Sequence, residues 1–212
     1  MKKNENFVIT INRELGSGGR TIGRLLAERL DVPYYDKTLI DALQAKYHYS
    51  VEEIEQLKGR KHSWWAEVER ILKIGPGMNS DFYMPKKGDE PDLLSTDDIF
   101  NTETLILQDL AIEKSCVIAG RSGFFVFRAH PNHLNILIQA SMPFRVERVM
   151  RKQNLSEEEA RKTIEKVDKM RENYMNKYAK TSRYDTRNYD LVITADGKTE
   201  EQIVDLIMTY IG

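Results

Sequence analysis

The chain has 212 residues, 41% of them hydrophobic, which suits one domain with a sizeable core, or one domain that carries an inserted subdomain. Its 32 lysines and arginines nearly balance 33 aspartates and glutamates, and the net charge of -1 excludes the bulk basic field that attracts nucleic acid or anionic membranes. The single cysteine, Cys116, excludes an internal disulfide framework, and no apolar run is long enough to span a bilayer. We therefore expect a soluble, cytoplasmic protein that binds neither nucleic acid nor membranes. The sequence does not indicate its oligomeric state.

The first structured segment predicts a phosphate-binding loop. An apolar, β-branched run over 7–11 indicates a strand, and it leads through a glycine-rich segment into a helical pattern over 21–30. Glycines in such a segment allow positive φ angles that point successive N–H groups at an anion, and the helix that follows adds its N-terminal dipole. We therefore expect this loop to bind a nucleotide, the alternative being an ordinary glycine-rich turn between a strand and a helix.

The loop follows the G-x-x-x-x-G-K-[ST] pattern only in part. Aligning Gly19, Arg20 and Thr21 with G-K-T places Glu14 at the first glycine and Arg20 at the lysine. Thr21 fits the role of Mg²⁺ ligand. Arginine contacts phosphate bidentately, but it does not simply replace a lysine that follows the transferring phosphoryl group.

Strand and helix patterns alternate along the rest of the chain. Apolar runs predict strands over 32–35, 115–119, 134–138 and 189–193, and helical patterns cover 98–114, a segment from 143 onward, 156–179 and 200–211. Five short strands separated by helices predict an α/β fold with a doubly wound, five-stranded parallel sheet in a three-layer α/β/α arrangement. The carboxyl ends of the strands then form the edge at which ligands bind.

A long segment between the second and third strands interrupts this alternation. It runs from Asp36 to Lys114 and combines helical patterns with a polar, glycine- and proline-rich stretch over 75–91, which we expect to be a flexible loop or lid. Such an insertion is placed where a second substrate is held, although a purely structural cap explains it nearly as well. We expect Trp64 and Trp65 to belong to the core of this cap rather than to a base-stacking platform.

Basic residues follow the third and fourth expected strands. Arg121 comes directly after the third strand, and Arg145, Arg148 and Arg151 follow the fourth at three-residue spacings that place neighbours on one helix face. Several arginines at the open edge of a nucleotide-binding sheet would supply the positive charge that phosphoryl transfer needs. The alternative is a solvated helix face paired with nearby glutamates.

These segments together resemble the cytidylate kinase-like relatives of the cytidylate kinases, within the nucleoside monophosphate kinase group, over nearly the whole chain. Residues 11–20 are similar to the G-S-G-G-R form of the relatives' phosphate loop, and residues 33–37 to the segment that enters the monophosphate-binding region. Residues 119–123 are similar to the D-G-R-D-x-G segment of cytidylate kinases, 167–171 to their R-D-x-x-R lid helix, and 188–193 to their last strand. The resemblance implies a sheet of the P-loop nucleotide kinase type and ATP and Mg²⁺ as cofactors.

The resemblance also implies a division of the chain and a set of site residues. It implies one P-loop kinase-like domain over 1–212, with 36–100 as a helical monophosphate-binding or cap insertion and about 145–185 as a lid region. The phosphates of the nucleoside triphosphate would lie on Gly16, Ser17, Gly18, Gly19, Arg20 and Thr21, with Thr21 on the metal. The acceptor would contact Asp36, Arg121, Asp168 and Arg171, and the catalytic arginines would be Arg20, Arg121, Arg148 and Arg151.

Four positions depart from the strict cytidylate kinase pattern, which has a lysine at Arg20, aspartates at Ala119 and Ser122, and an arginine at Val167. A carboxylate at the end of the third strand helps to hold Mg²⁺ through water, and without it the metal depends on Thr21 and the phosphates. We expect ATP-dependent phosphoryl transfer to a small acceptor, with CMP or dCMP as the leading acceptor by resemblance only. The alternatives are a nucleotide-binding regulatory or sensor protein with little or no kinase turnover, and a kinase for a non-nucleotide metabolite.

Overall fold

The computed structural model describes residues 1–36, 96–120 and 122–212 of the chain. The elements in these ranges are, in order, β1 (Val8–Arg13), α1 (Gly19–Leu30), β2 (Tyr34–Asp36), α5 (Thr96–Glu113), β3 (Cys116–Ala119), α6 (Gly123–Val126), β4 (His133–Gln139), α7 (Met142–Gln153), α8 (Glu157–Tyr178), the 3₁₀ helix η2 (Thr186–Asn188), β5 (Leu191–Thr194) and α9 (Glu200–Ile211). The strands and helices expected in these ranges are present with small shifts at their ends, whereas α6 and η2 were not expected. The stretch over 75–91 and the two tryptophans of the expected insertion lie outside the described residues.

The five strands form one parallel sheet in the order β2-β3-β1-β4-β5, which confirms the predicted fold class. β1 lies at the centre, where Ile9 is paired with Val117 of β3 on one side and with Leu134 of β4 on the other. From β1 the chain crosses over β3 to reach β2, and from β3 it returns across β1 to reach β4. The connections after β1 and β3 therefore run in opposite directions, and the crevice at the carboxyl ends of these two strands is where such sheets bind ligands.

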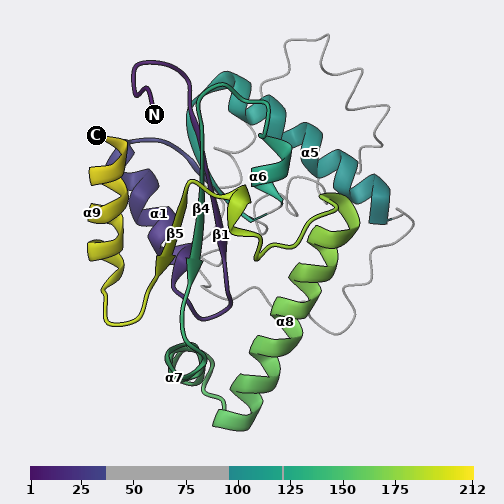
Figure 1. The fold of residues 1–212 in the computed structure, drawn as a ribbon, viewed down its shortest axis with the longest axis vertical. Coiled ribbons are helices and arrows are strands. Elements are labelled where there is room, and N and C mark those ends of the chain that lie inside the picture. The colour runs from purple at the N-terminus through teal and green to yellow at the C-terminus, as the bar shows by residue number, and fades with distance from the viewer. Residues whose placement is uncertain (37–95, 121) are drawn as a thin grey trace, which may run out of the picture.

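Helices cover both faces of the sheet (Figure 1). α1 and α9 lie on one face, and α5, α6 and α8 lie on the other. α7 lies beyond the carboxyl end of β4, next to the first turns of α8. Among the described residues no helix is long and apolar enough to cross a membrane.

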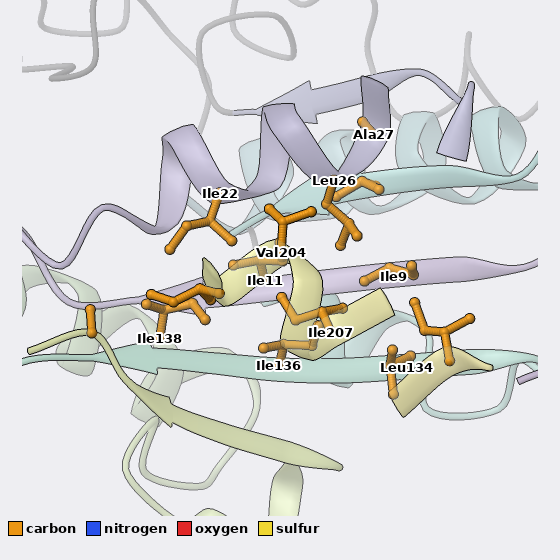
Figure 2. Close-up of a cluster of buried hydrophobic side chains, with 14 of the residues drawn as sticks. Ile9, Ile11, Ile22, Leu26, Ala27, Leu134, Ile136, Ile138, Val204 and Ile207 are labelled. Atoms are coloured by element: carbon orange, nitrogen blue, oxygen red, sulfur yellow. The ribbon is translucent and has the colours of Figure 1, made fainter. Parts of the chain in front are cut away.

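The main core lies between the sheet and the α1–α9 layer (Figure 2). Ile9 and Ile11 of β1 meet Ile22 of α1 and Ile207 of α9, and all four side chains are fully buried. Each such side chain contributes about 1.5–3 kcal/mol when it leaves water. Cys116 of β3 also lies in the interior, fully buried, and burial raises the pKa of its thiol to about 12.

A second apolar cluster connects the loop after β1 to the helices at the ligand edge. Leu15 of that loop packs with Val146 and Val149 of α7 and with Ala160 and Ile164 of α8. α8 is started by a capping box, in which the Ser156 hydroxyl accepts from the backbone N–H of Glu159 and the Glu159 side chain accepts from the backbone N–H of Ser156. The loop is therefore held by apolar packing against α7 and α8, which carry Arg145, Arg148 and Arg171.

Candidate phosphate-binding site

The segment between β1 and α1 has the backbone geometry of an anion-binding loop. Gly16 and Gly18 have φ angles of +87° and +85°, in the left-handed region that favours glycine. A Cβ atom on Gly16 would lie only 2.8 Å from the backbone oxygen of Arg145, so the loop touches α7 directly. Gly18 is the N-cap residue of α1 and gives the helix no capping side chain, so an anion can take that role at the positive end of the helix dipole.

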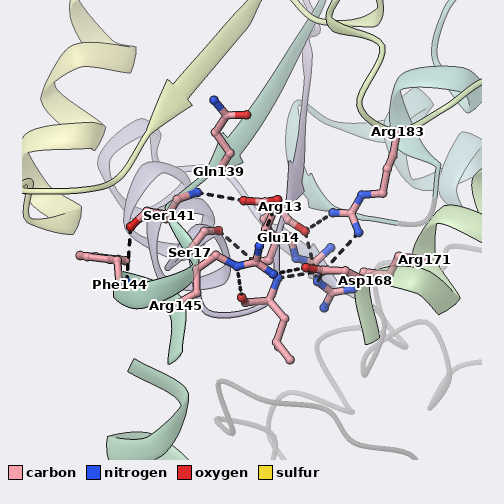
Figure 3. Close-up of polar contacts among 12 residues, drawn as sticks. Arg13, Glu14, Ser17, Gln139, Ser141, Phe144, Arg145, Asp168, Arg171 and Arg183 are labelled. Carbon is pink, nitrogen blue, oxygen red and sulfur yellow. Dashed lines mark hydrogen bonds and ion pairs between the residues drawn. The ribbon is translucent and has the colours of Figure 1, made fainter. Parts of the chain in front are cut away.

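Glu14, at the position of the first glycine of the usual pattern, fastens the loop instead of blocking it (Figure 3). Its Oε2 accepts from the backbone N–H of Ala140 at 2.9 Å, and its Oε1 lies 3.2 Å from Nη1 of Arg145. The backbone N–H and the hydroxyl of Ser17 both donate to the Glu14 carbonyl oxygen, at 3.3 Å and 2.9 Å. Glu14 therefore turns its carboxylate away from the loop and ties the loop to the start of α7.

Arg145 and Asp168 form a buried pair that holds the next residue, Leu15, by its backbone. Arg145 Nε donates to the Leu15 carbonyl oxygen at 2.8 Å, and Asp168 Oδ1 accepts from the Leu15 N–H at 3.1 Å. The two side chains also form an ion pair with each other, and the two residues are only 5% and 7% exposed. Asp168, expected from the sequence to contact the acceptor, is in this structure part of the support beneath the phosphate loop.

Two further arginines meet at the end of β1. Arg171 Nη1 donates to the Arg13 carbonyl oxygen at 3.1 Å, and Arg183 Nη2 donates to the same oxygen. Both guanidinium groups also face Asp168, with Nη1 of each at 3.5 Å and 3.3 Å from Oδ1. Burial, together with the neighbouring charges of Arg13 and Arg183, lowers the pKa of Arg171 to about 9. Arg171 therefore remains a cation at neutral pH.

Arg183 was missed by the sequence analysis, although it is among the most buried side chains of the described residues, with 2% exposure. Its backbone N–H donates to Glu172 at 3.1 Å, and its carbonyl oxygen accepts from the Tyr189 hydroxyl at 2.7 Å. That hydroxyl in turn accepts from Asn12 of β1 at 3.0 Å. Little in the local sequence distinguishes this arginine from its neighbours, since its fixed position comes from residues of three other segments.

Arg20 and Asp36, which the sequence assigns to opposite substrates, are paired with each other. Arg20 Nη2 lies 2.5 Å from Asp36 Oδ2, and the two side chains are 17% and 9% exposed. Arg20 extends from the first turn of α1, and Asp36 is the last residue of β2, so the pair joins two neighbouring parts of the ligand edge. Their predicted roles stay predictions, but Arg20 is directed toward the end of β2 in this structure.

The three arginines of α7 do not share one environment. Arg145 is buried, Arg148 is partly buried with Nη1 2.6 Å from Glu200 Oε1, and Arg151 is exposed. The Arg148 guanidinium lies 3.5 Å from the point that a Cβ on Gly18 would occupy, so it borders the loop. A step of three residues turns an α-helix by 300°, and two such steps rotate the side chains well away from a common face. The predicted spacing places neighbours near one another but not all three on one face, and Arg121 lies outside the described residues.

Thr21 is the remaining predicted ligand, and it lies half-buried in the first turn of α1. Among the described residues no group of three or more histidine, cysteine, aspartate or glutamate side chains is arranged to hold a metal ion. Mg²⁺ keeps several waters and commonly binds through one or two protein oxygens and the substrate's phosphates. A threonine hydroxyl beside a phosphate loop fits that donor set.

The sheet order, the loop after the first strand and the arginines around it define an α/β protein of the P-loop kinase type. A family model described as the cytidylate kinase-like family matches residues 8–196. The chain belongs to this family.

Two relatives among curated proteins differ in how much of the chain they match. The cytidylate kinase of Methanosarcina barkeri is 29% identical over 205 residues, which are 96% of this chain and 95% of that protein. The uronate isomerase of Corynebacterium glutamicum is 38% identical over 101 residues, 47% of this chain, and the match spans only 20% of that protein.

Solved structures share the fold. A crystal structure of a protein from Eubacterium ventriosum superposes with a TM-score of 0.70 at 24% identity, covering 97% of this chain and 98% of that one. The shikimate kinase of Bacteroides thetaiotaomicron superposes with a TM-score of 0.51 at 14% identity and the same coverage, 97% and 98%. At these identities the likeness describes the architecture alone.

Proposed function

We propose that this protein is an ATP-dependent kinase that transfers the γ-phosphoryl group to a small acceptor, with CMP or dCMP as the leading acceptor. The observation that carries the proposal is the loop of Gly16 and Gly18, fixed in left-handed geometry at the start of α1 and fastened to α7 by Glu14. Family membership and the printed name of the Methanosarcina barkeri relative support a phosphorylated nucleoside as acceptor.

On the donor side, the loop binds the triphosphate through backbone N–H groups and the dipole of α1. Arg148 borders Gly18 and adds a cation on the α7 side, while Glu200 fixes its direction. Thr21 would hold Mg²⁺ together with the phosphates, and the metal would neutralise charge on the phosphate oxygens. The protein's own residues thereby position the triphosphate and screen its charge.

On the acceptor side, the carboxyl end of β2 contributes Asp36 and α8 contributes Arg171. Asp36 offers a hydrogen-bond acceptor to a hydroxyl or amino group, and Arg171 offers a cation to an anionic group. Transfer of a phosphoryl group requires mostly alignment and positive charge rather than covalent participation of the protein. The described side chains fit these two requirements without a nucleophile.

The test is ADP release by purified protein with ATP, Mg²⁺ and a panel of nucleoside monophosphates. Release that depends on CMP or dCMP supports the proposal, and Asp36→Asn should then raise KM for that acceptor more than KM for ATP. Arg29→Gln is the matched control, since Arg29 is an exposed residue of α1 that pairs with Asp205 at 3.0 Å. Its kinetics should equal those of the wild type.

The other outcomes separate the alternatives. Saturable ATP binding without turnover on any acceptor would favour a nucleotide sensor, and turnover only with a non-nucleotide metabolite would favour a metabolite kinase. Failure to bind any nucleotide would refute all three.

A further inference from the structure

Arg13, the last residue of β1, carries a guanidinium group whose surroundings differ from those of the neighbouring arginines. Within residues 1–36, 96–120 and 122–212, hydrogen bonds join other residues to the Arg13 carbonyl oxygen, but none is formed by its guanidinium, and no carboxylate forms an ion pair with it. The side chain is nevertheless only partly exposed. Burial lowers the pKa of Arg13, an effect that the charges of Tyr34 and Asp36 oppose and those of Arg183 and Arg20 reinforce.

The position of this side chain is fixed by two glycines. A Cβ atom on Gly19 would lie 2.5 Å from Cβ of Arg13, and one on Gly120 would lie 2.2 Å from Nη1 of Arg13. The aliphatic part of the side chain thus packs against the start of α1, and the guanidinium lies over the residue that follows β3. This is the crevice between the carboxyl ends of β1 and β3, where the connections of the sheet diverge.

The surrounding charges favour an anion at this place. The cluster contains five arginines, Arg13, Arg20, Arg145, Arg171 and Arg183, and three carboxylates, those of Glu14, Asp36 and Asp168. Arg145 and Arg183 each form ion pairs with carboxylates and hydrogen bonds with backbone oxygens, and Arg20 forms an ion pair with Asp36 at 2.5 Å. Asp36 offsets the charge of Arg13 only from a distance, and a partly buried cation without a direct partner is costly. A phosphoryl group is the anion that the geometry of the adjoining loop suits.

We propose that the Arg13 guanidinium contacts a phosphoryl group of the substrates. From the end of β1 it would take the cationic role that the lysine of the usual loop pattern has in the first turn of the helix. This inference rests on the proposed function and adds a catalytic residue to it. The phosphoryl group is either the γ-phosphoryl group of ATP or the phosphate of the acceptor, because both kinds of group meet in the crevice.

The step keeps Arg13 protonated throughout. An acceptor oxygen donates an electron pair to the γ-phosphorus, and the bond from that phosphorus to the β,γ-bridging oxygen breaks, its electron pair leaving with ADP. Arg13 donates hydrogen bonds to the phosphoryl oxygens without giving up a proton. A phosphate acceptor loses no proton at the attacking oxygen, and a hydroxyl acceptor would release its proton to solvent.

The experiment measures affinity and thermal stability of Arg13→Gln by titration calorimetry and thermal melting. If the phosphoryl group belongs to ATP, the Kd for ATP should rise about tenfold while the Kd for ADP changes less than twofold. If it belongs to the acceptor, the Kd for CMP should rise about tenfold instead. In either case Tm should stay equal to that of the wild type or rise, because the variant removes a cation that has no partner in the described structure.

Three further variants sharpen the test. Arg13→Lys should restore part of the affinity, and Gly120→Ala should reproduce part of the loss by displacing the guanidinium. Arg20→Gln should weaken binding of the ligand that Arg13→Gln affects less than Arg13→Gln does. Unchanged affinities for ATP and CMP in Arg13→Gln would overturn the inference, as would a fall in Tm with affinity lost only in proportion to unfolding. A larger loss of affinity for that same ligand in Arg20→Gln than in Arg13→Gln would also overturn it.

Failure of the proposed function gives a different result. If the wild type binds neither ATP nor inorganic tripolyphosphate, the proposal that the loop binds phosphate is refuted, and the proposed role of Arg13 is refuted with it. If the wild type binds ATP and Arg13→Gln binds it equally well, together with CMP, only the role of Arg13 is refuted.

Discussion

Replacing Arg145 by methionine should destabilise the protein strongly, because Arg145 connects the phosphate loop to both helices of the ligand edge. Methionine keeps the unbranched apolar part of the side chain and removes the charge. The change deletes the hydrogen bond to the Leu15 carbonyl oxygen and leaves the carboxylates of Glu14 and Asp168 without this partner.

The structure also limits the size of the effect. Breaking a buried ion pair by removing one partner costs about 3–5 kcal/mol. In the variant, Asp168 would still pair with Arg183 and accept a hydrogen bond from the Leu15 N–H, and Glu14 would still accept one from the Ala140 N–H. Neither carboxylate would therefore lose all of its partners. We therefore expect a loss of about 3 kcal/mol in the free energy of unfolding, at the lower end of that range.

Guanidinium chloride unfolding at pH 7.5 measures this loss, and the denaturant slope should not change. The double variant Glu14→Gln with Arg145→Met should recover about 1 kcal/mol, because it neutralises one of the two carboxylates left behind. A loss below about 1 kcal/mol in Arg145→Met, or no recovery in the double variant, would show that the pairs around Arg145 do not hold the loop.

Three further predictions concern a histidine, a glycine and a helix cap. Burial lowers the pKa of His133 from its ordinary value of 6.5 to about 4, so the folded state binds fewer protons than the unfolded one between these values. The contribution of neutral His133 to the free energy of unfolding is thus fully present above pH 6.5 and is lost as the pH falls toward 4. In denaturant unfolding, the free energy of unfolding of the wild type should fall by about 2 kcal/mol more than that of His133→Gln between pH 7.5 and pH 5. Gly16→Ala should raise the Kd for ATP more than tenfold in calorimetry, because alanine is strained at a φ of +87° and would meet the Arg145 backbone. Ser156→Ala should cost about 1 kcal/mol of unfolding free energy by removing the cap of α8.

Each of these predictions has its own control. Equal losses in wild type and His133→Gln on acidification would assign the pH dependence to other groups. Gly197→Ala carries the backbone strain of a φ of +68° with no atom within 4 Å of the added Cβ, so it should leave ATP affinity unchanged. Glu165→Ala, an exposed change in the middle of α8, should cost less than Ser156→Ala if the cap is what matters.

Local patterns predicted the elements and their order well. The strands are short apolar runs, and the helices carry their start signals in the sequence, such as Ser156 with Glu159 before α8 and Thr199 with Gln202 before α9. The glycines after β1 likewise indicated the phosphate loop, because the need for positive φ is a property of one or two residues.

The sequence by itself therefore determined the α/β architecture, the loop and a general richness in arginine at its ligand edge. Only the tertiary structure decided what each charged residue does. Asp168 holds the Leu15 N–H across 153 positions of sequence, and Arg145 holds the Leu15 carbonyl oxygen across 130. Strand and helix signals arise from neighbours along the chain, whereas the choice between a buried support and a ligand contact depends on which partners the folded sheet brings within hydrogen-bonding distance.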